Sequence, residues 1–174
     1  MDTTDTSTLL PPEIAERMGQ WGEWKQSYPI SLADIQRWAI NAYWPEDPPR
    51  LFWDAEYAAA TRWQGIIAPQ EFNPFAWTMD AQYPKGGEQP AVGAVLKQRG
   101  FQVLNGGQAD EFGEMMRPGD VIRSRSRLAE TTQKTTRFGE TLFITSEEEW
   151  LNQRDELVRR RLSTSAAYLP GGAS

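Results

Sequence analysis

Four side chains that we consider for acid–base chemistry lie in residues 46–77, the stretch around which we take the rest of the chain to be organised. They are the carboxylates Asp47, Asp54, Glu56 and Glu71. A buried carboxyl group with a raised pKa can act as a general acid or base. Structural roles fit most of them better, because Asp54 can cap a helix and Glu56 can occupy its first turn. We expect Glu71 to be solvated, and Asp47 to be either a catalytic group or a turn residue beside prolines.

The composition removes the usual partners of such carboxylates. The 174 residues include no histidine and no cysteine, so the commonest general base and the thiol nucleophile are both missing. The acidic residues do not have the spacing of a calcium loop, and no glycine-rich phosphate loop is present. We therefore predict no metal site and no cofactor.

Length and charge limit the classes of protein that remain. A chain that is 39% hydrophobic and has eight tryptophans can close one core. We expect a single domain over 13–169, with tails at 1–12 and 170–174. The formal net charge of -6 argues against a nucleic-acid partner. We also expect a cytoplasmic protein without a membrane partner, because no apolar run reaches the length of a span and the N-terminus lacks the pattern of a signal peptide.

The first half of the chain predicts short helices separated by prolines. Ser31 looks like the N-cap of a helix over 31–43, which Pro45 ends. Asp54 can cap a second helix that ends near Gly65. A buried bridge over 66–68 should follow.

The next helix has two possible starts, which the sequence leaves open. Pro69 could be its first residue, or Asn73 could be its N-cap with Pro74 at the first position. In both cases an apolar stripe lies on one face of the helix, at steps of three and four residues. The stripe consists of Phe72, Phe75, Ala76, Met79 and Tyr83. We expect it to lie against a sheet.

The second half predicts four antiparallel strands. Their expected ranges are 103–115, 120–135, 140–151 and 156–169, separated by turn residues. The acidic run 147–149 and the basic run 159–161 should face each other across the last hairpin, as an exposed, charge-paired surface. Arg123, Arg125 and Arg127 alternate along one strand face, and we expect them to be solvated.

Three segments together resemble a known family. These are YPISLADIQRWAINAYWPEDPPRLFWDAEYAAATRWQGIIAP, VLNGGQADEF and RPGDVIRSRSRL. They resemble the MaoC-like acyl dehydratases, and within that group the N-terminal FAS1-like dehydratase domain, from about Trp24 to Tyr168. The resemblance implies an α+β hot-dog fold, in which a curved antiparallel sheet wraps around a central helix and pairs with a second such domain.

The catalytic motif of that family is largely replaced here. Catalytic members carry G-D-x-N-P-[LIV]-H-x5-[AS], whose Asp and His activate water for addition to a trans-2-enoyl-CoA. Aligned through its spacing to Ala58, the motif places its Asp on Asp47 and its His on Phe52, while Pro49 and Arg50 replace the Asn and Pro. The family's A-H-G segment, whose glycine amide helps to bind the thioester oxygen, becomes Ala68, Pro69 and Gln70.

The resemblance therefore implies a hot-dog half that shapes the pocket for a bulky acyl-CoA thioester, while a partner hot-dog chain supplies the Asp and His. Asp47 is the catalytic candidate, and Trp44 could add to an apolar lining. The expected substrate-binding residues are Arg50, Phe52, Trp53, Trp63, Ile67, Ala68, Gln70, Phe72, Trp77, Asn105 and Gly106. Two alternatives stay open. One is a non-catalytic acyl-CoA-binding or scaffold homodimer, and the other is a self-sufficient hydratase that uses Asp47 with a residue such as Glu71.

Overall fold

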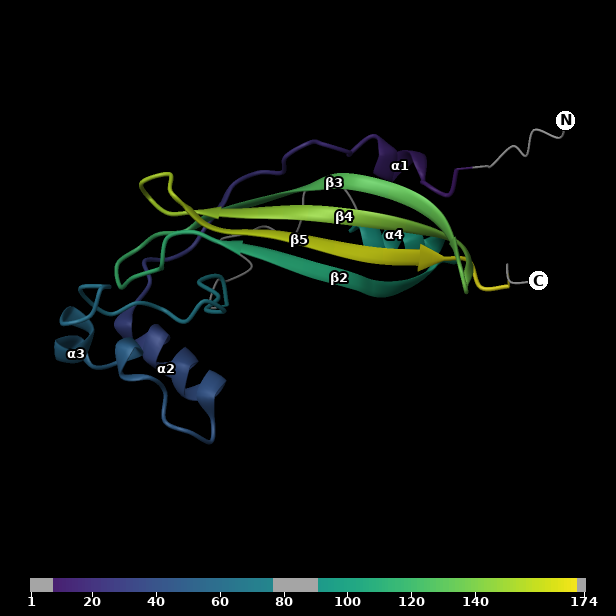
Figure 1. The fold of residues 1–174 in the computed structure, drawn as a ribbon. Coiled ribbons are helices and arrows are strands. Elements are labelled where there is room, and N and C mark those ends of the chain that lie inside the picture. Colours follow the sequence, from purple (N-terminus) through teal and green to yellow (C-terminus); the bar gives the residue numbers. More distant parts are fainter. Residues whose placement is uncertain (1–7, 77–90, 172–174) are drawn as a thin grey trace, which may run out of the picture.

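A five-stranded antiparallel sheet forms the body of the protein. The computed structural model describes residues 8–76 and 91–171. The strands are β1 (Lys25–Gln26), β2 (Gln102–Phe112), β3 (Arg123–Thr136), β4 (Gly139–Leu151) and β5 (Leu157–Tyr168). They are arranged in the order β1-β3-β4-β5-β2 and curve along their length (Figure 1). The four predicted antiparallel strands and the α+β class are confirmed. Strand β1 was not predicted, because a strand of two residues has no recognisable sequence pattern.

Tight turns set the register of the long strands. Gly139 has φ 86°, a conformation that glycine adopts without strain, and it begins β4 after a turn at residues 137–138. At the next turn the buried side-chain oxygen of Asn152 accepts hydrogen bonds from the N–H groups of Arg154 (2.9 Å) and Glu156 (3.1 Å). These turns bring β3, β4 and β5 side by side, so most pairing in the fold is between strands that follow each other in the chain.

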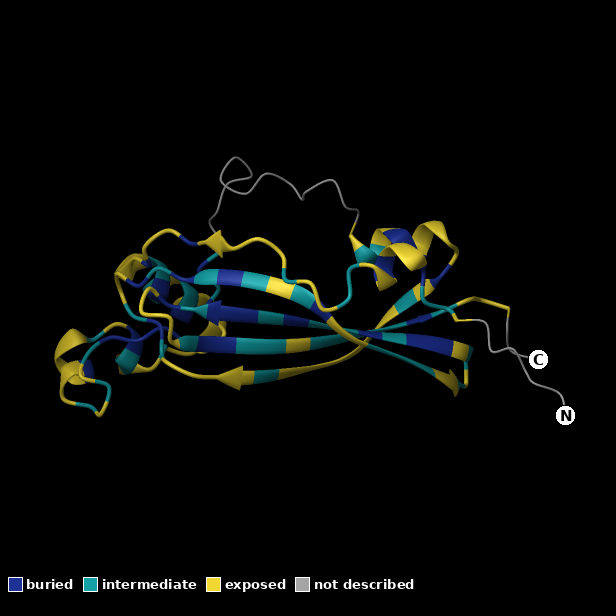
Figure 2. Cartoon of the chain, turned by 90° about the horizontal axis from the view of Figure 1, so that it is seen from above, coloured by how far each residue is buried: buried dark blue, intermediate teal, exposed yellow. Residues whose placement is uncertain are grey.

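The two outer strands of the sheet have different surroundings. Residues 18–30 run along β3, where the N–H of Gly22 donates to Ser126 (2.8 Å) and that of Ser27 donates to Ile122 (2.8 Å). Strand β2 pairs with β5 on one side, and no described strand pairs with its other side. No residue of β2 is fully buried (Figure 2). The β2 edge is therefore open for pairing within the described part of the chain.

A helix that the sequence did not predict packs on the sheet. Helix α4 (Val92–Gln98) buries Val95 and Leu96 against Leu142, Ile144 and Ala167 of the sheet. The segment was missed because the helix is only seven residues long and Gly93 lies inside it. Helix α1 (Pro12–Ala15) adds Ile14 to the same cluster.

The predicted helix start at Pro69 is wrong. Residues 69–76 form separate turns, closed by hydrogen bonds from Phe72 N–H to Pro69 (2.9 Å) and from Ala76 N–H to Asn73 (3.2 Å). Phe72 therefore reaches the core from a turn rather than from a helical stripe. The alternative start at Asn73, with Met79 and Tyr83, continues into 77–90, which lie outside the described residues.

Residues 31–65 form a helical lobe at one end of the sheet (Figure 1). The lobe contains α2 (Leu32–Tyr43), the 3-10 helix η1 (Arg50–Phe52) and α3 (Ala55–Ala59). The predicted caps are confirmed, because Ser31 accepts from Asp34 N–H (3.1 Å) and Asp54 from Tyr57 N–H (2.9 Å). Helix α3 ends earlier than expected, since turns occupy 60–64. None of the helices in the described ranges is long and apolar enough to cross a membrane.

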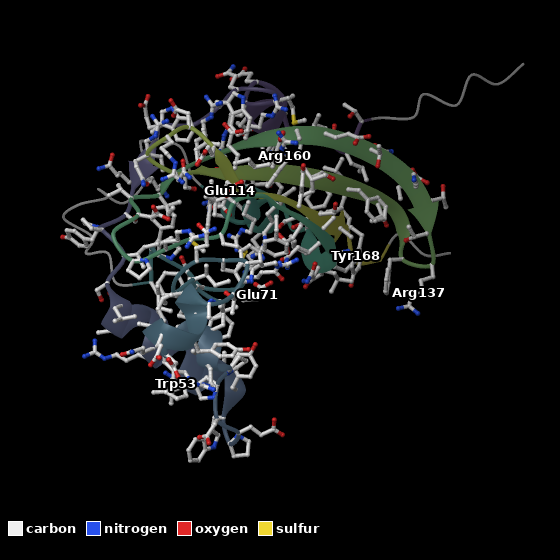
Figure 3. All side chains as sticks on the ribbon, turned by 60° about the vertical axis from the view of Figure 1, so that its left-hand side comes forward. Trp53, Glu71, Glu114, Arg137, Arg160 and Tyr168 are labelled. Atoms are coloured by element: carbon white, nitrogen blue, oxygen red, sulfur yellow. The ribbon has the colours of Figure 1, made fainter. Side chains whose placement is uncertain are left out.

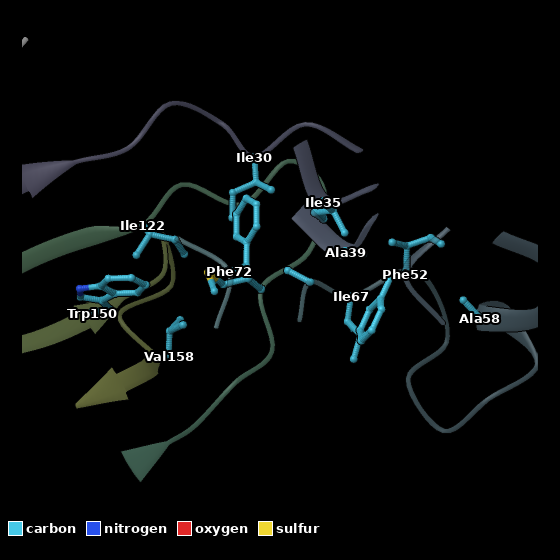
Figure 4. Packing of buried hydrophobic residues seen from close by; sticks show 13 residues of the cluster. Ile30, Ile35, Ala39, Phe52, Ala58, Ile67, Phe72, Ile122, Trp150 and Val158 are labelled. Atoms are coloured by element: carbon cyan, nitrogen blue, oxygen red, sulfur yellow. The ribbon is translucent and has the colours of Figure 1, made fainter. Parts of the chain in front are cut away.

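A buried cluster joins this lobe to the sheet. Ile35 and Ala39 of α2 and Ala58 of α3 meet Phe72 and Ile67 of the connecting segment (Figure 4). On the sheet side the cluster is completed by Ile122, Trp150 and Val158. We call it the lobe cluster. Fully burying one such large side chain stabilises a fold by about 1.5–3 kcal/mol, so this cluster fixes where the lobe sits.

The charged sheet face is less exposed than expected. The facing of 147–149 and 159–161 is confirmed by the register Glu148↔Arg161 and Glu149↔Arg160. However, Glu147, Glu149 and Arg159 are buried, so the expectation of an exposed surface is wrong. The aliphatic parts of long charged side chains pack readily, and this sheet is curved enough to enclose them.

The three alternating arginines of β3 are not simply solvated. Arg125 pairs with Glu149 (2.5 Å), Arg127 pairs with Glu147 (2.6 Å), and Arg123 pairs with Asp155. Trp21 and Trp24, from the segment beside β3, stack on the guanidinium groups at 4.3–4.8 Å. The expectation failed because these tryptophans come from about 100 residues earlier in the chain.

The boundary of the N-terminal tail also needs correction. Leu9 and Leu10 pack against the cluster of α4, and the N–H of Leu9 donates to the Gln133 side chain (3.0 Å). Residues 9–12 therefore belong to the folded domain. Residues 1–7 and 172–174 lie outside the described ranges.

Gly113 offers a test of the packing between β2 and β5. A Cβ atom at this position would collide with the carbonyl oxygen of Leu157. We expect Gly113→Ala to lower the free energy of unfolding by about 1–3 kcal/mol, because the backbone on both sides must shift. Urea unfolding measures the change. Gly93→Ala is the matched control, since Gly93 lies in α4 with open space around it, and it should leave stability unchanged or raise it by up to about 1 kcal/mol.

Candidate functional site

The polar candidates of the helical lobe lie on its surface. Asp47 is exposed, and its carboxylate has no hydrogen bond or ion pair within the described part of the chain. Arg50 is occupied by Asp54 (2.7 Å), and its guanidinium lies 4.6 Å from the Tyr57 ring centroid. Trp53 is exposed and donates its indole N–H to the Pro48 carbonyl (2.9 Å), and Figure 3 shows it on the lobe, away from the sheet. Arg50 and Trp53 therefore stabilise the lobe itself.

The apolar candidates belong to the lobe cluster. Phe52 is 8% exposed and its ring centroid lies 5.9 Å from that of Tyr43. Phe72 packs edge-on against Trp38 at 5.5 Å, and the buried Ile67 lies beside Phe52 in the same cluster (Figure 4). Trp63 is half-buried at the rim of the cluster, with the Arg62 guanidinium 4.4 Å from its ring. Packing therefore explains these four positions.

The predicted residues of β2 lie far from this region. Asn105 and Gly106 are exposed, and Asn105 accepts a hydrogen bond from Gly107 N–H (3.0 Å) in a local bulge. Seven residues of strand separate Asn105 from Phe112, a distance of about 23 Å. Gly106 lies against the Thr164 backbone, where a side chain would be crowded, so its role is close strand packing. Trp77 lies outside the described residues.

Ala68 and Gln70 are the two predicted residues that line a pocket. The pocket lies where β2 and β5 meet the segment after the lobe, and it opens to solvent; its cavity volume is about 10 Å³, room for about one water molecule. Its walls are 68–70, 112–116, Trp150, Val158 and Arg159. The N–H of Ala68 donates to the Met116 carbonyl (2.8 Å) and that of Glu114 to Leu157 (2.7 Å), which holds two of these walls together. Asp47 is not among the lining residues, so the structure does not bring it to Gln70.

Sequence reasoning missed the polar residues of this pocket, which lie on the sheet. Arg159 is only 5% exposed and its guanidinium carbon lies 3.4 Å from the Trp150 ring centroid. Its Nη2 approaches Glu148 at 3.4 Å. Burial lowers the pKa of Arg159, and the nearby positive charge of Arg161 lowers it further. A signal was available, because positions 148, 150, 159 and 161 share one face once the hairpin register is known.

Beside the pocket, Arg161 and Asp110 form a second ion pair. Arg161 Nε donates to Asp110 Oδ1 (2.6 Å) and Nη2 donates to Oδ2 (3.0 Å), a two-point contact that suits a guanidinium. Glu71 approaches the same arginine at 3.5 Å and remains largely exposed. The hydrogen bond with Asp110 raises the pKa of Arg161, and the same bond holds the pKa of Asp110 below its usual value. Glu71 therefore acts as an ion-pair partner at the sheet surface.

The described residues contain no group of three or more side chains suited to a metal ion. The predicted absence of a cofactor remains a prediction.

The Asp110–Arg161 pair makes a pH-dependent contribution to stability. The pKa of Asp110 is lower in the folded chain than its unfolded value of about 3.9, so the stabilisation is present above that pH and is lost as the pH falls through the folded pKa. We expect Asp110→Asn to cost about 1–3 kcal/mol at pH 7, because Arg161 keeps its charge without its main partner. Urea unfolding at pH 7 and pH 3 measures the change, which should shrink at pH 3. Glu111→Gln, a neighbour with a more exposed ion pair, should cost under about 1 kcal/mol, and an equal loss in both variants would contradict the assignment.

Comparisons with known proteins agree with this architecture. A probable enoyl-CoA hydratase alpha subunit from Thermomonospora curvata is 28% identical over 138 residues, which are 75% of this chain and 42% of that protein. The chain thus spans less than half the length of this curated relative. Among solved structures, the ChsH1-ChsH2 complex from Mycobacterium tuberculosis has a chain that superposes with a TM-score of 0.72 at 22% identity, over 92% of both chains. A MaoC-like dehydratase from Rhodospirillum rubrum superposes with a TM-score of 0.56 at 19% identity, over 85% of this chain and 92% of that one.

These structural likenesses confirm the predicted hot-dog fold. The family model for the FAS1-like dehydratase domain region matches residues 16–161, which include the lobe, the pocket walls and most of the sheet. The chain therefore belongs to the FAS1-like dehydratase domain family.

Proposed function

We propose that this chain is the non-catalytic half of an (R)-specific enoyl-CoA hydratase or acyl dehydratase. A second hot-dog chain supplies the Asp and His that activate water, and this chain shapes the pocket for a bulky acyl-CoA. The burial of Phe52 is the observation that carries the proposal. Phe52 occupies the position that the family motif gives to its histidine, and here it packs into the lobe cluster.

The chemistry available at this position supports that division of labour. A phenyl ring cannot transfer a proton, and the loss of a positioned general acid or base costs roughly 10²- to 10⁴-fold in rate. Asp47, which occupies the position of the motif's Asp, lies on an exposed loop five residues before a buried ring. The chain thus lacks a paired acid and base at the motif, and its polar pocket residues lie elsewhere, on β4 and β5.

An exposed sheet edge and exposed apolar side chains support a partner subunit. Strand β2 has no partner on its outer side within the described ranges, and unpaired strand edges readily accept another strand. The lobe extends beyond the β2 side of the sheet in Figure 1, and its α2 end exposes Ile40, Tyr43 and Trp44, the last by 79%. A subunit that paired with β2 could also cover this apolar surface. Two similar proteins also belong to assemblies of more than one chain: one is a probable enoyl-CoA hydratase alpha subunit, and the other is a chain of the ChsH1-ChsH2 complex.

Two other functions remain distinguishable by experiment. A non-catalytic acyl-CoA-binding homodimer would use the same β2 edge but would need no catalytic partner. A self-sufficient hydratase would need Asp47 to work with a residue such as Glu71. That pairing is disfavoured because Glu71 faces Arg161 of the sheet while Asp47 lies on the outer loop of the lobe.

The first test of the proposal is the activity of the chain by itself. We expect the purified chain to hydrate trans-2-enoyl-CoA substrates at least about 10²-fold more slowly than its complex with a hot-dog chain that keeps the D-x-N-P-x-H motif, because Phe52 cannot replace histidine. Spectrophotometric hydration assays on acyl chains of graded bulk measure both preparations. Asp47→Ala and the neighbouring control Glu46→Ala should leave the activity of the complex unchanged. Fast turnover by the isolated chain that Asp47→Ala abolishes would instead support the self-sufficient hydratase.

The second test is the state of assembly. We expect the chain expressed alone to form a homodimer through β2, since a symmetric interface is the commonest substitute for a missing partner. Light scattering at micromolar concentration should give twice the mass of one chain, and amide hydrogen exchange over 102–112 should slow as concentration rises. Strand β3 serves as the internal control, because residues 18–30 already cover its edge. Its hydrogen exchange should not change with concentration. A stable monomer, with or without the partner, would refute the interface.

A further inference from the structure

Trp44, directly after α2, is the most exposed large apolar side chain of the described residues. It is 79% exposed, and its neighbours Ile40 and Tyr43 are exposed by 52% and 38%. Because positions 40, 43 and 44 are three and four residues apart, these side chains lie on one side of the helix end. Trp44 does not line the pocket. An exposed tryptophan with apolar neighbours instead indicates a surface that another molecule covers.

The loop that follows α2, residues 44–49, is tied down at both ends. Three of its six residues are proline, which fixes φ. The first end is tied to the helix, because the N–H of Glu46 donates to the Tyr43 carbonyl (2.8 Å). The other end is tied to the lobe, because the Trp53 indole N–H donates to the Pro48 carbonyl (2.9 Å). A side chain on such a loop loses little conformational freedom when it binds, which favours affinity.

The charges of the loop argue against a lipid surface as the molecule that covers Trp44. Exposed aromatic side chains also occur where proteins lie on membranes, beside Lys and Arg residues that attract anionic headgroups. This loop instead carries Glu46 and Asp47, both exposed, and no Lys or Arg. The arginine that follows it, Arg50, is already paired with Asp54 (2.7 Å). Because an anionic membrane would repel the loop, a protein is the better match for Trp44.

A second copy of this chain is a poor match for the exposed indole. A tryptophan side chain buries about 150–250 Å² when it is enclosed. The pocket beside Ala68 has a cavity volume of about 10 Å³, room for about one water molecule, so it cannot accept an indole ring. Trp44 fits better on a chain of different sequence, one whose surface has an apolar pocket of the size of an indole.

The place of this loop in the fold connects it to the open edge of the sheet. In Figure 1 β2 is the lowest strand of the sheet, and the C-terminal end of α2 with the loop after it lies lower still. No described strand pairs with the outer side of β2. A chain that adds a strand to β2 therefore extends the sheet towards the side on which the loop lies.

We propose that Trp44 is the anchor of a heteromeric interface, and that it binds in an apolar pocket on a second, different hot-dog chain that pairs with β2. The inference rests on the proposed function, because this second chain is the catalytic partner. Ile40 and Tyr43 lie around the anchor and exclude water from it. Trp44 then determines the choice of partner, because the catalytic chain has a pocket for the indole and a second copy of this chain does not.

Truncation of the anchor tests the proposal. We expect Trp44→Ala to weaken the complex with the hot-dog chain that keeps the D-x-N-P-x-H motif by at least about 30-fold, the loss typical of an interface hot spot. The homodimer should keep its dissociation constant, and sedimentation measures both equilibria. Tyr28→Ala is the matched control, because Tyr28 is an aromatic residue with 46% exposure in the segment that runs along β3. It should change neither equilibrium by more than about 3-fold.

The solvent exposure of the indole gives a second measurement that does not depend on affinity. The chain is labelled with 5-fluorotryptophan, and the Trp44 resonance in the ¹⁹F spectrum is assigned by its loss in Trp44→Phe. In the homodimer this resonance should shift between H₂O and D₂O, because the indole is exposed, and the shift should disappear in the complex with the catalytic chain. Vesicles of phosphatidylglycerol should leave the resonance unchanged.

The outcomes separate this inference from the proposed function. The anchor is overturned if Trp44→Ala binds the catalytic chain as tightly as the wild type does, if it weakens the homodimer equally, or if the vesicles bury the indole. In those cases the hydration assay on the complex still tests the proposed function. If Trp44→Ala prevents assembly but the wild-type complex does not hydrate enoyl-CoA, the anchor stands and the proposed function fails. If the wild type does not bind the catalytic chain, both fail.

Discussion

The packing of the lobe cluster is the constraint on which the rest of the structure depends. The lobe and the sheet are far apart in sequence, and the cluster that contains Phe72, Ile122 and Trp150 is where they meet. This packing fixes the direction in which the segment after Ala68 leaves the core, and so places one wall of the pocket opposite the sheet. Close-packed interiors transmit such constraints because they tolerate few voids. The cluster and the pocket share Ala68, Met116, Trp150 and Val158, so the packing of the cluster shapes the pocket walls.

The packing of the lobe cluster also explains why a phenylalanine suits position 52, where the family motif has its histidine. A histidine at position 52 would place a polar ring within an apolar cluster, where an unpaired polar group is costly. Phe52 instead contributes apolar contact with Tyr43 and the cluster. The residue at position 52 can therefore either pack in the apolar cluster or take part in acid–base chemistry. In this chain Phe52 packs in the cluster. Because Phe52 cannot transfer a proton, the proposed function requires a second chain that supplies the catalytic histidine.

Local patterns predicted the fold better than they predicted the site. Caps and strand alternation are short-range signals, so α2, α3 and the β3–β4–β5 meander follow from the sequence. The arrangement of the candidate site residues depends on long-range packing, which residue spacing does not show. Phe52 and Phe72 resembled a ligand lining by residue type but lie in the core, while Arg159 looked like a surface charge but is buried against Trp150. Only the curvature of the sheet and the position of the lobe distinguish these cases, and neither is encoded in spacing.

The open sheet edge and the pocket are physically connected in this architecture. The pocket wall 112–116 begins at the last residue of β2, and β2 is the sheet edge without a described partner. A chain that paired along this edge, as proposed, would restrain the strand whose end forms the pocket wall. The ion pairs of Arg160 with Glu111 and of Arg161 with Asp110 tie the same strand to β5, the strand of Arg159. Pairing along β2 would therefore restrain both strands that border the pocket, so under the proposed function we expect a partner to order the pocket wall.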